Sequence, residues 1–158
     1  GTDLVVAKDG FMGDSCYTFA VGEVDPEVLA LCRTTKESLY VGIEACRAGH
    51  RIGEISNAVQ AYCERRGYSV VREMCGHGIG RDMHEDPEVP NYGRKGTGTI
   101  LEVGDTIAIE PMASLGSEKI VIDQQDGWTY STRDGSLAAH FEHTVLITED
   151  GAEILTQL

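Results

Sequence analysis

The chain has 158 residues, enough for one domain with a hydrophobic core. Its net charge of −13 argues against unspecific nucleic-acid binding, which needs many lysine and arginine side chains to neutralise phosphates. No run of about 18 or more apolar residues predicts a membrane span, and the start of the chain lacks the layout of a secretory signal. Five cysteines without a C-x-x-C pair favour reduced thiols and a cytoplasmic location.

The start of the chain predicts a β-hairpin. Its strands are expected at residues 3–8 and 11–21, and its loop at residues 9–10. The loop dipeptide Asp-Gly is typical of two-residue hairpin turns. With this loop Asp3 faces Cys16, and Asp14 lies on the same face of the hairpin, diagonal to Asp3. Taken singly, each aspartate is typical of a solvated strand end. Two carboxylates so close repel each other unless cations lie between them, so the pair indicates a cation site.

The following residues predict two helices and then a series of short strands. Asp25-Pro26 is typical of a helix start, and the apolar spacing after it continues until Gly49. A second helix is expected over 52–63, with Gly67 as its stop. Glycine-rich turns separate the later β-prone runs, which are SVVRE, DTIAIE, EKIVI, HTVLIT and EILTQ. This order, without a repeat or a linker, predicts an α+β fold in one domain over 1–158.

Five residues in these elements describe a carboxylate-rich metal site: Asp3, Asp14, His77, Glu110 and Glu142. His77 is surrounded by glycines in GHGIG, which indicates a loop held close to other groups after the strand VVREM. Glu110 ends DTIAIE and shares a strand face with the small residues Thr106 and Ala108, so its side chain is expected to point into a cavity. Four carboxylates and an imidazole suit a pair of manganese, iron, cobalt or zinc ions better than a thiolate zinc site. Such a pair holds water as hydroxide, so the site predicts a hydrolase.

Two further residues are candidates for the same site. His84, in MHEDP, can donate a hydrogen bond to a substrate amide or to a developing oxyanion, or it can simply lie in a turn ahead of Pro87. Cys75 is close to His77 in the sequence, which also allows a cysteine-hydrolase interpretation. Neighbours in sequence rarely point at each other, and no third group orients this pair, so the metal interpretation is preferred.

Taken together, these motifs resemble the methionine aminopeptidases of type I, the bacterial-like class of the M24 metallopeptidases with the pita-bread fold. The matching segments include SVVREMCGHGIGRDMHEDPEVPNY, DTIAIEPM, DGWTYSTRDGSLAAHFEHT and VLITEDGAEILT. GHGIG is shared with the wider creatinase and prolidase relatives, whereas IEPM, DGWT and EHT are more specific to the methionine enzymes. The resemblance runs from residue 3 to the C-terminus, and it implies an antiparallel sheet covered by helices.

The resemblance also implies a reaction and a role for each residue. The five carboxylate and imidazole residues would hold the two divalent ions, with Asp14 and Glu142 bridging them. Glu110 would be the general acid and base, and His77 and His84 would be the other catalytic residues. The substrate-binding residues would be His84, Trp128, Cys75 and Met83. The implied reaction removes N-terminal methionine, by a metal-bridging hydroxide, from peptides and nascent proteins with a small second residue.

The chain also departs from the family pattern. Met83 stands where an aromatic pocket residue is usual, His140 where a polar amide is common, and Ala138 where a residue often helps to hold a monovalent ion. Because the chain begins almost at Asp3, we expect the family's N-terminal segment to be missing and 1–158 to be the C-terminal portion of the fold. The surface left uncovered predicts self-association. Two alternatives stay open, which are a pita-bread metallopeptidase of the Xaa-Pro type and a catalytically weak metal- or peptide-binding fragment.

Overall fold

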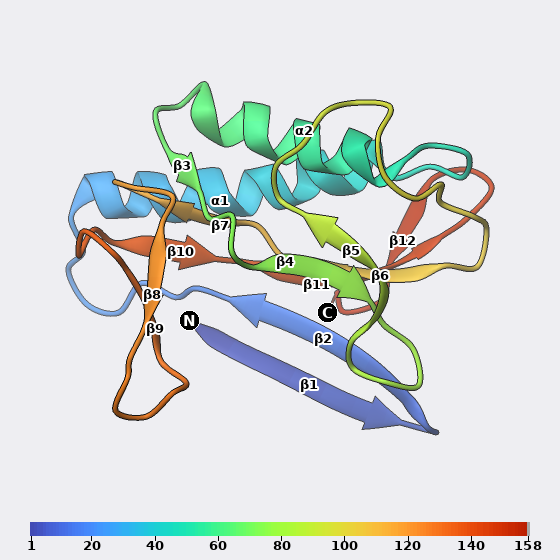
Figure 1. The fold of residues 1–158 in the computed structure, drawn as a ribbon, viewed down its shortest axis with the longest axis horizontal. Coiled ribbons are helices and arrows are strands. Elements are labelled where there is room, and N and C mark those ends of the chain that lie inside the picture. The colour runs from blue at the N-terminus through green and yellow to red at the C-terminus, as the bar shows by residue number, and fades with distance from the viewer. Residues whose placement is uncertain (158) are drawn as a thin grey trace.

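The structure is a computed structural model that describes residues 1–157. Figure 1 shows two helices lying side by side over one part of a twisted sheet, with a long hairpin extending away from them. In chain order the elements are β1 (Thr2–Lys8), β2 (Phe11–Tyr17), α1 (Pro26–Ala45), α2 (Ile52–Glu64), β3 (Ser69–Val70), β4 (Cys75–Gly78), β5 (Glu85–Pro90), β6 (Thr106–Ile109), β7 (Met112–Ser114), β8 (Ile120–Ile122), β9 (Tyr130–Thr132), β10 (Ala138–His140), β11 (Glu142–Ile147) and β12 (Ala152–Ile154). None of the helices among these residues is long and apolar enough to cross a membrane.

The main sheet has seven strands and is antiparallel in every pairing. Six strands follow the order β1-β2-β11-β6-β4-β5, and β12 also pairs with β11. A three-stranded sheet has the order β10-β7-β3, and β8 pairs with β9 as a separate hairpin. The α+β class and the antiparallel sheet are therefore as predicted.

The β1–β2 hairpin has the predicted register, with Asp3 opposite Cys16 and Val5 opposite Asp14. Both loop residues have positive φ, 53° at Asp9 and 82° at Gly10, as a two-residue turn of type I′ requires. The predicted extension of the second strand to residue 21 is wrong. β2 ends at Tyr17, which pairs with Thr2, so the strand stops where its partner strand begins.

The two helices start where the sequence predicts. Asp25 caps α1 by accepting a hydrogen bond from the Glu27 N–H at 2.8 Å, and Pro26 follows as the first helical residue. The helix ends at Ala45 and not near Gly49, because Cys46 has an extended backbone. The apolar faces of both helices pack against the sheet around a core that includes Leu31, Leu39, Ile55, Val59, Ile107, Ile109, Val145 and Ile147. This core holds the strands that carry the polar residues.

The later strands were predicted only in part. The five β-prone runs overlap β3, β6, β8, β11 and β12, although β3 is just Ser69–Val70 and β12 ends at Ile154. The strands β4, β5, β7, β9 and β10 were not predicted. β5 contains Pro87 and Pro90, and proline normally argues against a strand assignment. β5 lies at the end of the main sheet, where a missing N–H is tolerated.

Candidate metal centre

The register of the main sheet brings polar residues from distant parts of the chain to one face. Thr144 Oγ1 accepts a hydrogen bond from the Asp14 N–H and donates one to the Asp14 carbonyl, both at 2.9 Å. Thr144 pairs with Ala108 of β6, and Ala108 pairs with His77 of β4. Paired residues of an antiparallel sheet share a face, so Asp14 and His77 point to the same side across the small Ala108 side chain. Glu110, two residues beyond Ala108, follows directly after the same strand.

Four of the five predicted ligands meet on this face. Candidate ligand atoms of Asp14, His77 and Glu142 all lie within 4.8 Å of one another, and all three residues are buried. His77 Nε2 lies 3.9 Å from Asp14 Oδ2 and 3.9 Å from Glu110 Oε1. Each residue belongs to or adjoins a different strand, so the cluster depends on the whole centre of the sheet. We call these four residues the central cluster.

His77 lies within β4, and the prediction that it lies on a loop is wrong. The flanking glycines allow β4 to pack tightly between β5 and β6, because a side chain at Gly76 would collide with the Ala108 carbonyl and one at Gly78 with the Asp86 carbonyl. His77 Nδ1 is 2.8 Å from the Gly78 carbonyl oxygen. A carbonyl only accepts, so Nδ1 carries the hydrogen, and Nε2 faces the carboxylates.

Electrostatics make the central cluster unfavourable without a counter-charge. Burial, together with the neighbouring Glu110, Asp14 and Asp3, raises the pKa of Glu142 to about 10. Burial and the nearby Asp3 carboxylate also raise the pKa of Asp14. Asp14 Oδ1 is buried and has no hydrogen-bond partner. Carboxylates that repel each other, an orphaned oxygen and a free imidazole nitrogen are together a donor set that fits divalent cations.

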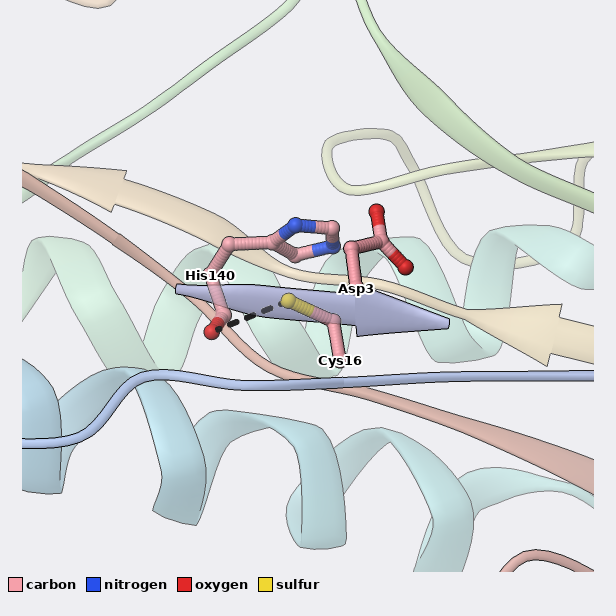
Figure 2. Close-up of side chains that lie close together, drawn as sticks. All are labelled: Asp3, Cys16 and His140. Carbon is pink, nitrogen blue, oxygen red and sulfur yellow. Dashed lines mark hydrogen bonds between the residues drawn. The ribbon is translucent and has the colours of Figure 1, made fainter. Parts of the chain in front are cut away.

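The fifth predicted ligand, Asp3, belongs to a second group. Figure 2 shows its carboxylate beside the ring of His140, with the Cys16 sulfur close to both. Candidate ligand atoms of these three residues all lie within 4.8 Å of one another. We call them the second cluster. Glu110 lies between the two clusters, because its Oε2 is 3.4 Å from His140 Nε2 and its Oε1 is close to His77.

Sequence reasoning did not single out Cys16, Thr144 or the contact of His140 with Glu110. A signal for the first two existed. Cys16 is opposite Asp3 in the predicted hairpin, and Thr144 is two residues after Glu142, so both share a face with predicted ligands. The contact of His140 depends on how β10 is placed beside the main sheet, which local sequence patterns do not reveal.

The predicted substrate residues fall into two places. His84 and Cys75 line one hollow of about 640 Å³ together with His77, and the rings of His84 and His77 are perpendicular with centroids 4.4 Å apart. Trp128 lies between β8 and β9, is 82% exposed, and borders a different hollow with Met74 and Tyr130. Met83 is 39% exposed. The structure therefore brings His84 and Cys75 together but leaves Trp128 apart from them, and the substrate-binding roles stay predictions.

An α+β fold with buried carboxylates facing a histidine fits the class of metallopeptidases, and comparison with known proteins specifies the family. The profile of Metallopeptidase family M24 matches residues 2–149, so the chain belongs to this family. A methionine aminopeptidase of Clostridium acetobutylicum is 51% identical over 154 residues, which are 98% of this chain and 61% of that protein. The chain thus spans about three fifths of the curated relatives that it matches.

Solved structures show the same relationship. The crystal structure of methionine aminopeptidase from Rickettsia prowazekii superposes with a TM-score of 0.96 at 44% identity, covering 98% of this chain and 62% of that one. Prolidase from Pyrococcus furiosus superposes with a TM-score of 0.76 at 25% identity, covering 99% of this chain and 40% of that one. The predicted pita-bread fold and the resemblance to methionine aminopeptidases are therefore confirmed.

Proposed function

We propose that this chain is the metallopeptidase catalytic domain, over 1–158, of a cytoplasmic aminopeptidase that removes N-terminal methionine from peptides and nascent proteins with a small second residue. The observation that carries the proposal is the buried meeting of Asp14, His77 and Glu142 beside Glu110, with one Asp14 oxygen left without a partner. The relatives named methionine aminopeptidase, at up to 51% identity, support the choice of substrate.

The residues of the central cluster, with Asp3, would hold two divalent ions of the manganese, iron, cobalt or zinc type. Asp14 suits a bridging role because Oδ1 is unpartnered while Oδ2 faces His77. Glu142 suits the other bridge because its charge is otherwise opposed by burial and by neighbouring carboxylates, which raise its pKa. When bound, such ions supply an activated water at neutral pH and stabilise the developing negative charge.

Glu110 is placed to move a proton. Its side chain is 12% exposed, so it borders both the buried cluster and the solvent side of the site. It can accept a proton from the attacking water and pass it to the leaving amine, the role of a general base that then acts as a general acid. His77 and His84 both line the hollow, and His84 is exposed, so it can donate a hydrogen bond to the scissile amide.

The hollow beside His84 also suits the start of a peptide. Acidic residues form much of its lining, namely Asp82, Glu85, Asp86 and Glu88. Such a concentration of negative charge attracts the ammonium group of a free N-terminus. Cys75 in this hollow would contact the methionine side chain. Met83 and Trp128 lie outside its lining, and their substrate-binding roles stay predictions.

The proposal is tested by methionine release from the peptide Met-Ala-Ser with added manganese or cobalt. We expect release by the native chain, and a loss of about 10²- to 10⁴-fold in Glu110→Gln, because the proton-transfer group is removed. Glu153→Gln, at an exposed site on β12, is the matched control and should keep full activity. Faster cleavage of Xaa-Pro peptides would replace the proposal by the prolidase alternative. Two bound ions without release would mean a catalytically weak fragment.

We also propose that the chain self-associates through β1. This strand is at the end of the main sheet, and all seven of its residues are exposed, including Leu4 at 58% and Val6 at 63%. An edge strand with apolar exposed side chains pairs readily with a second copy. Light scattering at tens of micromolar protein should give a mass above that of the monomer. The Val6→Lys variant should give a lower mass than the native chain. A clean monomer for the native chain would contradict this.

A further inference from the structure

We propose that the second cluster, Asp3, Cys16 and His140, is itself a metal site, which binds an ion of the zinc or cobalt class through a carboxylate oxygen, a thiolate sulfur and an imidazole nitrogen. It differs from the set of four carboxylates and one imidazole that the resemblance implies, because Cys16 and His140 are not part of that set. This inference rests on the proposed function and deepens it, since Asp3 belongs both to the second cluster and to the proposed set of five metal ligands.

The geometry brings three elements together at this point. Asp3 comes from β1, Cys16 from β2 and His140 from β10, and Figure 2 shows their side chains converging. Their candidate ligand atoms lie within 4.8 Å of one another. Ligand atoms around a tetrahedral zinc ion lie about 3.5 Å apart, so a small rotation of the exposed Asp3 side chain closes the site.

An independent observation points to a ligand here. His140 Nε2 is buried and has no hydrogen-bond partner, although Glu110 Oε2 is 3.4 Å away. A buried polar atom without a partner is costly, so native structures rarely retain one. Cys16 is only 5% exposed, and its side-chain hydrogen bond is a weak S–H donation to the His140 carbonyl at 3.8 Å. An ion between the two side chains would supply a partner for both.

The donor types set the class of ion. Thiolate and imidazole suit zinc and cobalt, whereas carboxylates and water suit manganese and magnesium. Binding replaces the Cys16 S–H bond by a metal–sulfur bond, and the proton goes to solvent. Three protein ligands leave a fourth position open, as catalytic zinc sites do. Of the two ions in the proposed function, the one bound by Asp3 would therefore have softer donors than the one bound by His77.

The test is a titration of the metal-free full chain with Co²⁺ in the absence of oxygen, monitored by ultraviolet and visible absorption spectroscopy. We expect a near-ultraviolet sulfur-to-cobalt charge-transfer band whose final intensity corresponds to one sulfur-ligated ion per chain. Cys16→Ser should abolish the band, and His140→Gln should weaken cobalt binding about 10-fold or more. Cys75→Ser is the matched control, because Cys75 lies near His77 in the other cluster and its thiol should not contribute.

X-ray absorption of the native zinc-loaded chain gives a second measurement that needs no variant. We expect one sulfur neighbour at about 2.3 Å from zinc. Cobalt bound without a charge-transfer band, or a band that persists in Cys16→Ser, would overturn the inference. Neither readout depends on peptide hydrolysis. A sulfur ligand without methionine release would refute only the proposed activity, and release without a sulfur ligand would refute only this site.

Discussion

The carboxylates at the centre of the main sheet and those around the β8–β9 hairpin are in opposite situations. At the centre, burial and like charges raise the pKa of Glu142 to about 10 and also raise that of Asp14. Around the hairpin, hydrogen bonds lower the pKa of Asp134 to about 2 and also lower that of Asp126. The same functional group is thus disfavoured as an anion in one region and favoured in the other.

The hydrogen bonds explain the difference. Asp134 accepts from the Ser117 N–H at 2.7 Å and from the Ser136 hydroxyl at 2.7 Å. Asp126 accepts from the backbone N–H groups of Trp128 and Thr129. These aspartates have their partners within the chain and serve to hold turns. At the central carboxylates, burial and neighbouring like charges outweigh the hydrogen bonds, and cations are the partners that would offset them.

The largest expected effect is stabilisation by metal ions. At a free concentration 100 times the dissociation constant, each bound divalent ion should raise the free energy of unfolding by about 2.7 kcal/mol. Urea denaturation with manganese or cobalt, compared with a chelator, measures this gain. Asp134→Asn should keep it and Asp14→Asn should lose most of it. An equal gain in both variants would remove the distinction between the two regions.

The next effect is a trade of stability against metal binding at Glu142. In the metal-free protein at pH 7.5, Glu142→Gln should raise the free energy of unfolding, on the order of 2 kcal/mol, because no ionisable group has to be kept neutral in the buried site. The variant should also lose the stabilisation by metal. Thermal and urea denaturation measure both, and a destabilised metal-free variant would contradict the repulsion between the central carboxylates.

The pH dependence of the metal-free protein follows from the same group. The pKa of Glu142 rises from its ordinary 4.5 to about 10 on folding, so the folded state binds the extra proton. The contribution of Glu142 protonation to the free energy of unfolding is fully present below pH 4.5. It is lost as pH rises towards 10, at up to about 1.4 kcal/mol per pH unit. Denaturation across this range measures the slope. Glu142→Gln should flatten it, and an unchanged slope would assign it to other groups.

The smallest effect has the opposite sign and belongs to the hairpin region. Because the pKa of Asp134 falls from 3.8 to about 2, its stabilisation is present above pH 3.8 and is lost as pH falls towards 2. Asp134 is fully exposed, so solvent screens the effect. The free energies of unfolding of the native chain and of Asp134→Asn, measured by urea denaturation, should therefore differ slightly at pH 6 and converge near pH 2. A difference that grows on acidification would be inconsistent with this assignment.

Local sequence signals predicted the parts of the fold that depend on neighbours in the chain. The Asp9-Gly10 turn determined the hairpin register, so the pairing of Asp3 with Cys16 was predicted correctly. Asp25-Pro26 likewise marked the start of α1. The grouping of Asp14, His77, Glu110 and Glu142 was predicted from motifs that match a family, not from their geometry.

Features that depend on distant contacts were not predictable in this way. His77 lies in a strand because β4 packs between β5 and β6, which GHGIG alone does not show. The contact between His140 and Glu110 depends on the placement of β10, and β5 forms despite its prolines. Trp128 was expected in a pocket wall, and its exposure follows from its position beyond β8 and before β9.

The most direct test of the central claim is the location of the ions by anomalous diffraction from crystals soaked in cobalt or zinc. We predict two anomalous peaks within coordination distance of the central cluster and Asp3, both of them touching Asp14 and Glu142. Peaks confined to the hairpin aspartates, or no peak near Glu142, would contradict the claim that the buried carboxylates are held together by metal ions.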